Sequence, residues 1–199
     1  LLAEGAIASY FVPLDSSLES TWFTPGFNDT TWPTGPAGFG YENNLADYSN
    51  LIHTRVKPSE TIAGATSIYQ RYDFNVTNPA SFQNLVLRMR YEDGFIAYLN
   101  GREVARSNIS GTVRYNSTAG SNPDSQAVNF ENFPLFGVSL LNGSNNLAIQ
   151  VINQSVRSSD LLCEPELIDQ PGSNGGYFEN LLAGFRSEIE NDVIIDQSI

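Results

Sequence analysis

The side chains best able to do chemistry in this chain are few, and they do not form a recognisable catalytic pattern. His53 is the single histidine and Cys163 the single cysteine, and they lie far apart in the sequence. A catalytic nucleophile needs a Ser on a strained turn or a thiol beside a base, and no Gly-x-Ser-x-Gly string occurs. We therefore expect His53 to be structural and Cys163 to be a small buried hydrophobic residue.

Carboxylates are abundant, with 22 Asp and Glu residues in all. A glycosidase needs two of them roughly 5 to 10 Å apart, and many combinations in this sequence could supply such a pair. The most compact groups are Glu92 with Asp93 and Glu164 with Glu166. At turns and strand ends such residues usually serve solvation or capping. Because so many pairs are possible, no particular pair of carboxylates indicates a catalytic site. We predict that the chain is not an enzyme.

A second pattern is typical of carbohydrate recognition, which combines flat aromatic rings with amides and carboxylates that bind sugar hydroxyls. Predicted loops supply both kinds of side chain, and the candidate ligand-binding residues are Trp32, Tyr41, Asn43, Asn44, Tyr48, Tyr115 and Asn116. The alternative is that the aromatic residues pack over the end of the fold, as a set comprising Trp22, Trp32, Phe39 and Tyr41. The sequence leaves both interpretations open.

The segment 84–107 indicates which elements must position these side chains. Its apolar residues alternate over 85–91 with the period of two that a half-buried strand requires. Asp93-Gly94 and Asn100-Gly101 then supply the residue types that two-residue hairpin turns prefer. We therefore predict three antiparallel strands joined by two hairpins.

Other segments extend this pattern along the chain. Further strands are predicted over 7–12, 51–56, 67–76, 127–133, 137–141, 146–153 and 161–168. The segment 35–48 is rich in glycine and aromatic residues without periodicity, so we expect a long ordered loop. The polar segment 108–124 predicts a second long loop and a candidate binding edge. Residues 1–170 are thus predicted to form one all-β sandwich.

Composition narrows the classes of partner. Of 199 residues, 22 are acidic and 10 basic, and the net charge of −12 disfavours nucleic acid because no basic patch is segregated. No run of about 18 apolar residues occurs, so no membrane span is predicted. Lys57 is the only lysine, and the abundance of Asn, Ser, Thr and Gly is typical of secreted proteins. A lone cysteine excludes an intrachain disulfide. We expect an extracellular or cell-surface location.

The last thirty residues differ in character from the rest. Residues 171–176 have the composition of a linker, and 181–189 show the three-and-four spacing of an amphipathic helix. The chain then ends in an apolar piece with the candidate assembly residues Val193, Ile194 and Ile195. A terminal strand of this kind can pair with its own sheet or with the edge of a neighbouring copy. We predict a second segment, 171–199, made of linker, helix and terminal strand.

Two strings give the chain a family resemblance. The string FNDTTW at 27–32, followed by GPAGFGY at 35–41, resembles the opening of galactose-binding-like jelly-roll domains, including those attached to β-galactosidase-type enzymes. The string YEDGFIAYLNGREVAR at 91–106 is similar to the accessory domain found beside lamin-tail and CotH-kinase-like domains in large bacterial surface proteins. The resemblance covers residues 1–168.

The resemblance implies an antiparallel two-sheet jelly roll, an extracellular location and often a structural calcium ion, and it implies no catalytic residues. Calcium prefers hard oxygen ligands, and loops bearing carboxylates suit it. The candidate metal ligands are Asp29, Asp47 and Asp93. The leading functional prediction is a non-catalytic extracellular module that acts in adhesion or carbohydrate binding. The alternative is a structural subunit that forms a filament or surface layer with copies of itself by strand complementation.

Overall fold

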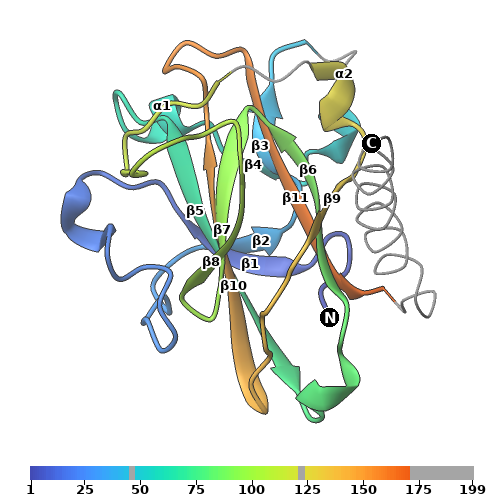
Figure 1. The fold of residues 1–199 in the computed structure, drawn as a ribbon. Helices are drawn as coiled ribbons and strands as arrows, with labels where there is room; N and C mark the ends of the chain where they lie inside the picture. Colours follow the sequence, from blue (N-terminus) through green and yellow to red (C-terminus); the bar gives the residue numbers. More distant parts are fainter. Residues whose placement is uncertain (45–47, 121–123, 171–199) are drawn as a thin grey trace, which may run out of the picture. The chain divides into compact units, whose positions relative to one another are not determined.

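The structure, a computed structural model, describes residues 1–44, 48–120 and 124–170. Within these residues two sheets face each other (Figure 1). The six-stranded sheet has the order β2 (Thr34–Pro36), β1 (Ile7–Phe11), β5 (Ser67–Val76), β10 (Gly143–Ile152), β7 (Gly94–Leu99) and β8 (Arg102–Ser107). The five-stranded sheet has the order β4 (Thr54–Arg55), β3 (Phe39–Glu42), β11 (Asp160–Asp169), β6 (Leu85–Glu92) and β9 (Glu131–Pro134).

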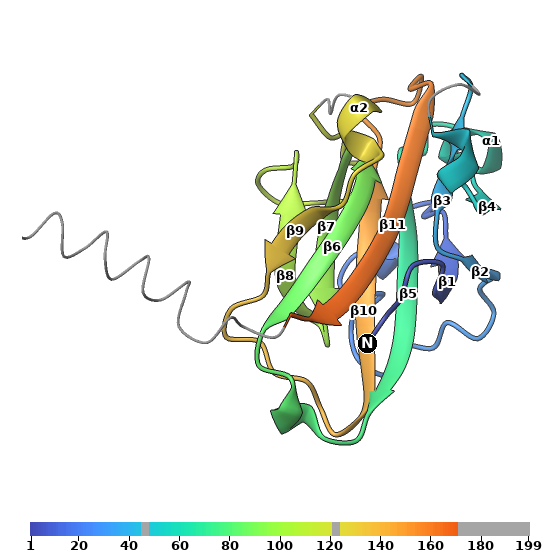
Figure 2. The ribbon, with the colours of Figure 1, turned by 90° about the vertical axis from the view of Figure 1, so that its right-hand side faces the viewer.

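Figure 2 shows the two layers, with β6 and β11 passing in front of β5 and β10 of the other sheet. Neighbouring strands are antiparallel throughout these sheets except for β3 and β4, which are parallel. The two α-helices in the described part of the chain are short, α1 (Pro58–Thr61) and α2 (Asp124–Ala127). Neither has the length and apolar character that crossing a bilayer requires. The predicted all-β sandwich is confirmed.

The hydrophobic core lies between the sheets and follows the predicted alternation. Residues Leu87 and Met89 of β6 are fully buried, as are Leu147, Ile149 and Val151 of β10. Cys163 of β11 joins the same cluster, which confirms that it is a buried hydrophobic residue. Burying one large apolar side chain contributes about 1.5–3 kcal/mol, so these facing rows hold the two layers together.

A second apolar layer covers the outer face of the six-stranded sheet. Trp22 stacks on Tyr69 of β5 with ring centroids 4.1 Å apart, and Phe23 stacks on Tyr98 of β7 at 4.2 Å. Both Trp22 and Phe23 come from the connection between β1 and β2. We call this set the aromatic layer: Trp22, Tyr69 and Ala148, with Phe11, Leu18, Phe23, Phe27, Trp32, Tyr98 and Tyr115 packed against them.

One of the two predicted hairpins is confirmed and the other is wrong. Asn100 and Gly101 have φ values of 52° and 83°, as a primed turn requires, and β7 pairs with β8. Asp93-Gly94 instead carries the chain from β6 in one sheet to β7 in the other. A side chain at Gly94 would place its Cβ 2.7 Å from that of Ala119, so this glycine serves close packing rather than a hairpin turn.

Three further segments differ from the prediction. The expected loop over 35–48 contains β3 and the end of β2, since glycines alternate there with buried Phe39 and Tyr41. No strand forms over 137–141, and the predicted strand over 127–133 is replaced by the end of α2 and the start of β9. The strands predicted over 67–76 and 161–168 are confirmed as β5 and β11.

Candidate functional site

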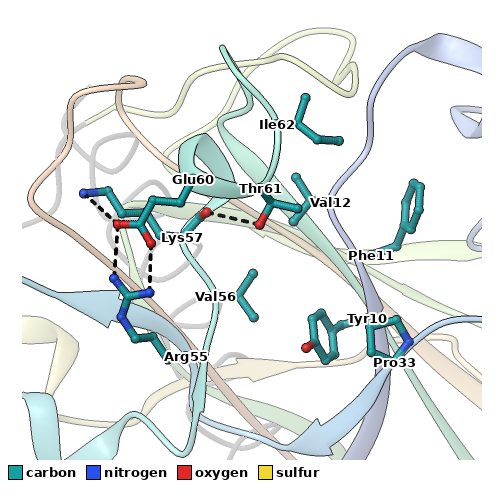
Figure 3. Close-up of a pocket in the computed structure, with 10 residues that line it drawn as sticks. All are labelled: Tyr10, Phe11, Val12, Pro33, Arg55, Val56, Lys57, Glu60, Thr61 and Ile62. Atoms are coloured by element: carbon teal, nitrogen blue, oxygen red, sulfur yellow. Dashed lines mark hydrogen bonds and ion pairs between the residues drawn. The ribbon is translucent and has the colours of Figure 1, made fainter.

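A groove of about 420 Å³ lies where β1 of the six-stranded sheet approaches β4 of the other sheet (Figure 3). The lining residues come from three short stretches of chain and are Tyr10, Phe11, Val12, Pro33, Arg55, Val56, Lys57, Glu60, Thr61 and Ile62. Figure 3 shows the charged side chains gathered on one side and Phe11 on the other. The groove therefore has an apolar wall and a charged wall.

The apolar wall is built by β1 and the residue before β2. Successive strand residues point to opposite faces, so Tyr10 packs inward on Phe39 with centroids 5.2 Å apart, and Phe11 packs outward on Trp32 at 5.1 Å. Both Tyr10 and Phe11 stay half-buried, and both line the groove. Pro33 follows Trp32 in the chain and lies beside Tyr10 (Figure 3).

The charged wall follows β4 into α1. Pro58 occupies the first turn of α1, where its fixed φ favours the helix and its missing N–H is not needed. This turn brings Glu60 back beside Arg55, and two hydrogen bonds of 2.9 and 3.2 Å join the guanidinium to the carboxylate. Lys57 Nζ lies 3.8 Å from Oε1 of Glu60. One carboxylate therefore faces two cations.

The electrostatics of this wall follow from these contacts. The hydrogen bonds from Arg55 lower the pKa of Glu60, and the same bonds raise the pKa of Arg55. Lys57 Nζ lies 4.9 Å from the centroid of the Tyr41 ring, which makes a cation–π contact. Glu60 is thus held ionised, and the wall carries one net positive charge.

The predicted ligand-binding residues do not form one surface. Tyr41, Tyr48 and Trp32 belong to three separate apolar clusters. Tyr41 and Tyr48 are closed to solvent, with exposures of 1% and 0%, so neither ring can stack on a sugar. Burial also raises the pKa of Tyr41 to about 12, and its hydroxyl donates to the Ser158 carbonyl at 2.8 Å. The prediction that these two rings bind ligand is wrong.

Two of the predicted residues support the groove from behind. Trp32 stacks on Phe11, and Tyr41 lies under the Lys57 ammonium group, so each contacts a lining side chain. The alternative interpretation, in which Trp22, Trp32, Phe39 and Tyr41 pack over the end of the fold, is right that these rings serve packing but wrong about the place. Phe39 and Tyr41 lie in the core between the sheets, and Trp22 and Trp32 belong to the aromatic layer.

The remaining predicted residues lie elsewhere. Asn43 and Asn44 are exposed after β3, where the N–H of Asn44 donates to Glu42 Oε1 at 2.6 Å. Tyr115 is half-buried in the aromatic layer, and Asn116 beside it is exposed. A hollow of about 550 Å³ lies in the predicted binding edge, lined by Asn108, Ile109, Ser110, Ser117, Thr118, Ala119 and Gly120. These seven residues include no aromatic ring.

The predicted metal ligands do not form a cage in the described residues. Asp29 Oδ2 accepts hydrogen bonds from Ser9 Oγ and from Arg71 Nε, so its charge is already compensated. Asp93 is buried, and its Oδ2 accepts from the N–H of Gln154 at 2.6 Å. No group of three metal-ligating side chains occurs in the part of the chain that the structure describes. Asp29 and Asp93 therefore do not fit a calcium site, and the ion remains an implication of the resemblance.

Asp47 and the candidate assembly residues Val193, Ile194 and Ile195 lie outside the described residues, as does the whole predicted segment 171–199. The sequence interpretation missed most of the groove, whose lining residues lie between 10 and 62. One signal was present: the only lysine of the chain, Lys57, stands beside a proline and three residues before a glutamate.

Comparison with known proteins supports the fold. No protein-family model and no curated protein matches the chain. Among solved structures, a glycosyl hydrolase family 2 member from Bacteroides cellulosilyticus is similar over 84% of this chain and 20% of its own, with 8% identity and a TM-score of 0.50. A β-glucuronidase from an uncultured Clostridium is similar over 77% of this chain and 22% of its own, with 18% identity and a TM-score of 0.46. A β-glucuronidase from Bacteroides uniformis is similar over 80% of this chain and 17% of its own, with 11% identity and a TM-score of 0.47.

The chain spans about a fifth of the length of these structures. At such low identity the likeness to the family 2 hydrolase concerns the fold alone. It agrees with the two-sheet β-sandwich that the family resemblance implies.

Proposed function

We propose that this chain is a non-catalytic carbohydrate-binding module and that the groove between β1 and β4 is its sugar site. The observation that carries the proposal is the pairing of a half-buried aromatic wall with a charged wall across one open groove. Aromatic rings bind the apolar face of a sugar, while charged and hydroxyl groups bind its hydroxyls. Tyr10 and Phe11 supply the rings, and Arg55 and Glu60 supply donors and acceptors.

The same wall argues against hydrolysis in the groove. Glycoside hydrolysis uses two carboxyl groups, one of which must be protonated at the working pH. Glu60 is the one carboxylate among the ten lining residues, and Arg55 lowers its pKa. A carboxylate held ionised in this way binds hydroxyl groups but does not donate a proton to a leaving group. Binding without turnover fits a module that acts in adhesion at a bacterial surface or within a secreted protein.

The test is binding of neutral and acidic oligosaccharides to the full chain by isothermal titration calorimetry. We expect Phe11→Ala to weaken binding several-fold because one aromatic face is lost. Phe136→Ala is the matched control, since Phe136 is 76% exposed and does not line the groove. Circular dichroism checks that both variants fold.

Should Phe11→Ala prove unfolded, Arg55→Gln on the exposed rim replaces it, because 61% of the Arg55 side chain is exposed. The proposal fails if the wild type binds no oligosaccharide, or if the folded groove variant binds as tightly as the wild type.

A further inference from the structure

The charge of the groove differs from that of the chain. The sequence carries a net charge of −12, yet the groove lining holds two cations, Arg55 and Lys57, and a single anion, Glu60. An acidic protein repels anions over most of its surface, so a cationic groove stands out as the place where an anion can dock. A neutral sugar needs no such excess of positive charge.

The ammonium group of Lys57 has unused hydrogen-bonding capacity. Its Nζ lies 3.8 Å from Glu60 Oε1, beyond hydrogen-bonding distance, and its other contact is the Tyr41 ring. Within the described residues, Lys57 Nζ donates no hydrogen bond, although an ammonium carries three donors. Only 21% of the Lys57 side chain is exposed, and its ammonium group lies over the Tyr41 ring.

Glu60 shows how a carboxylate sits in this wall. Its two oxygens take the fork of Arg55, and one of them also faces Lys57. A ligand carboxylate of the same shape and charge that approaches the outer end of this wall, beyond Glu60, would meet the unused donors of Lys57 (Figure 3). Further sugar rings of the same oligosaccharide would then extend past Glu60 toward Tyr10 and Phe11 on the opposite wall (Figure 3).

We infer that the groove selects saccharides that carry uronic acid residues, with Lys57 binding the carboxylate and Arg55 adding positive charge beside it. This inference rests on the proposed carbohydrate-binding function and adds the class of ligand. We expect salt to weaken this binding, because both cations are partly exposed. Dissolved ions screen exposed charges over a Debye length of about 10 Å at 0.1 M ionic strength.

The test compares hexamers of galacturonate, glucuronate and mannuronate with their methyl esters, which keep the sugar and remove the charge. Calorimetry on the full chain should show at least one free acid binding about tenfold tighter than its ester, a difference of about 1.4 kcal/mol. Lys57→Gln should bring the ratio between acid and ester toward one. Arg157→Gln is the matched control, because Arg157 is exposed and does not line the groove.

A gain of affinity gives a second test that misfolding cannot imitate. Glu60→Gln removes the competing carboxylate and frees the Arg55 fork, so the free acid should bind tighter than it binds the wild type. If acids and esters bind equally, or if Lys57→Gln keeps the difference between them, charge recognition is overturned while sugar binding stands. If no acid and no ester binds and neutral sugars also fail, the proposed function falls with it.

Discussion

Arg71 and Asp29 form an ion pair on the outer face of the six-stranded sheet, with Nε and Oδ2 3.0 Å apart and side-chain exposures of 2% and 16%. Arg71 belongs to β5, and Asp29 lies in the connection between β1 and β2. The guanidinium also donates to the carbonyls of Trp22 and Thr24. Three points of one long connection are therefore tied to a single strand residue, which fixes the aromatic layer on the sheet.

We expect Asp29→Ala to lower the free energy of unfolding by about 3 kcal/mol, because removing one partner leaves a buried charge uncompensated. Urea unfolding followed by Trp fluorescence measures the change. Glu103→Ala is the control, since it breaks the more exposed pair between Glu103 and Arg106, which should contribute less than about 1 kcal/mol. Equal losses in the two variants would contradict a special role for the Arg71 pair.

Gly40 should tolerate no side chain. A Cβ at this position would lie 1.8 Å from the Leu161 carbonyl oxygen, since β3 and β11 pair directly there. Gly40→Ala is expected to destabilise the fold by more than about 2 kcal/mol because the strands must separate. Gly120→Ala is the control, as its Cβ would meet its nearest atoms at an ordinary 3.6 Å. Thermal unfolding compares the two, and a Gly40→Ala protein as stable as the control would refute the close approach.

Cys163 should be chemically silent in the folded protein. Burial raises the pKa of its thiol far above the ordinary value, so the thiol stays protonated between pH 7 and 9. A disulfide reagent should therefore label Cys163 only after unfolding, whereas Ser110→Cys, at an exposed position, should be labelled at once and faster as the pH rises. Prompt labelling of the folded wild type would show that Cys163 is accessible.

The strands with regular alternation could be predicted from the sequence, and those with glycine on one face could not. The inward-facing residues of β5 are apolar at Ile68, Tyr72, Phe74 and Val76, with Gln70 as the one polar residue among them, and the predicted range 67–76 agrees with the structure. In β3, glycines separate the buried aromatics, so the segment looked like a loop. Asp93-Gly94 looked like a hairpin because the same glycine can serve a turn or close packing, and local sequence does not distinguish these.

The groove escaped prediction for a different reason. Its walls come from residues 10–12 and 55–62, and only the packing of two sheets brings these together. Tyr41 and Tyr48 were predicted to face solvent because aromatic residues in a segment without periodicity carry no sign of burial. In the structure, residues from other segments of the chain cover both rings. Whether such a ring is exposed therefore depends on contacts that are distant in the sequence.

One wall of the groove comes from each layer of the sandwich, so a bound molecule would contact both layers and hold them together. Any molecule that binds only the folded chain raises its stability, by about 2.7 kcal/mol at a concentration one hundred times the dissociation constant. Melting temperature thus offers a label-free way to search a library of glycans for the natural occupant of this groove.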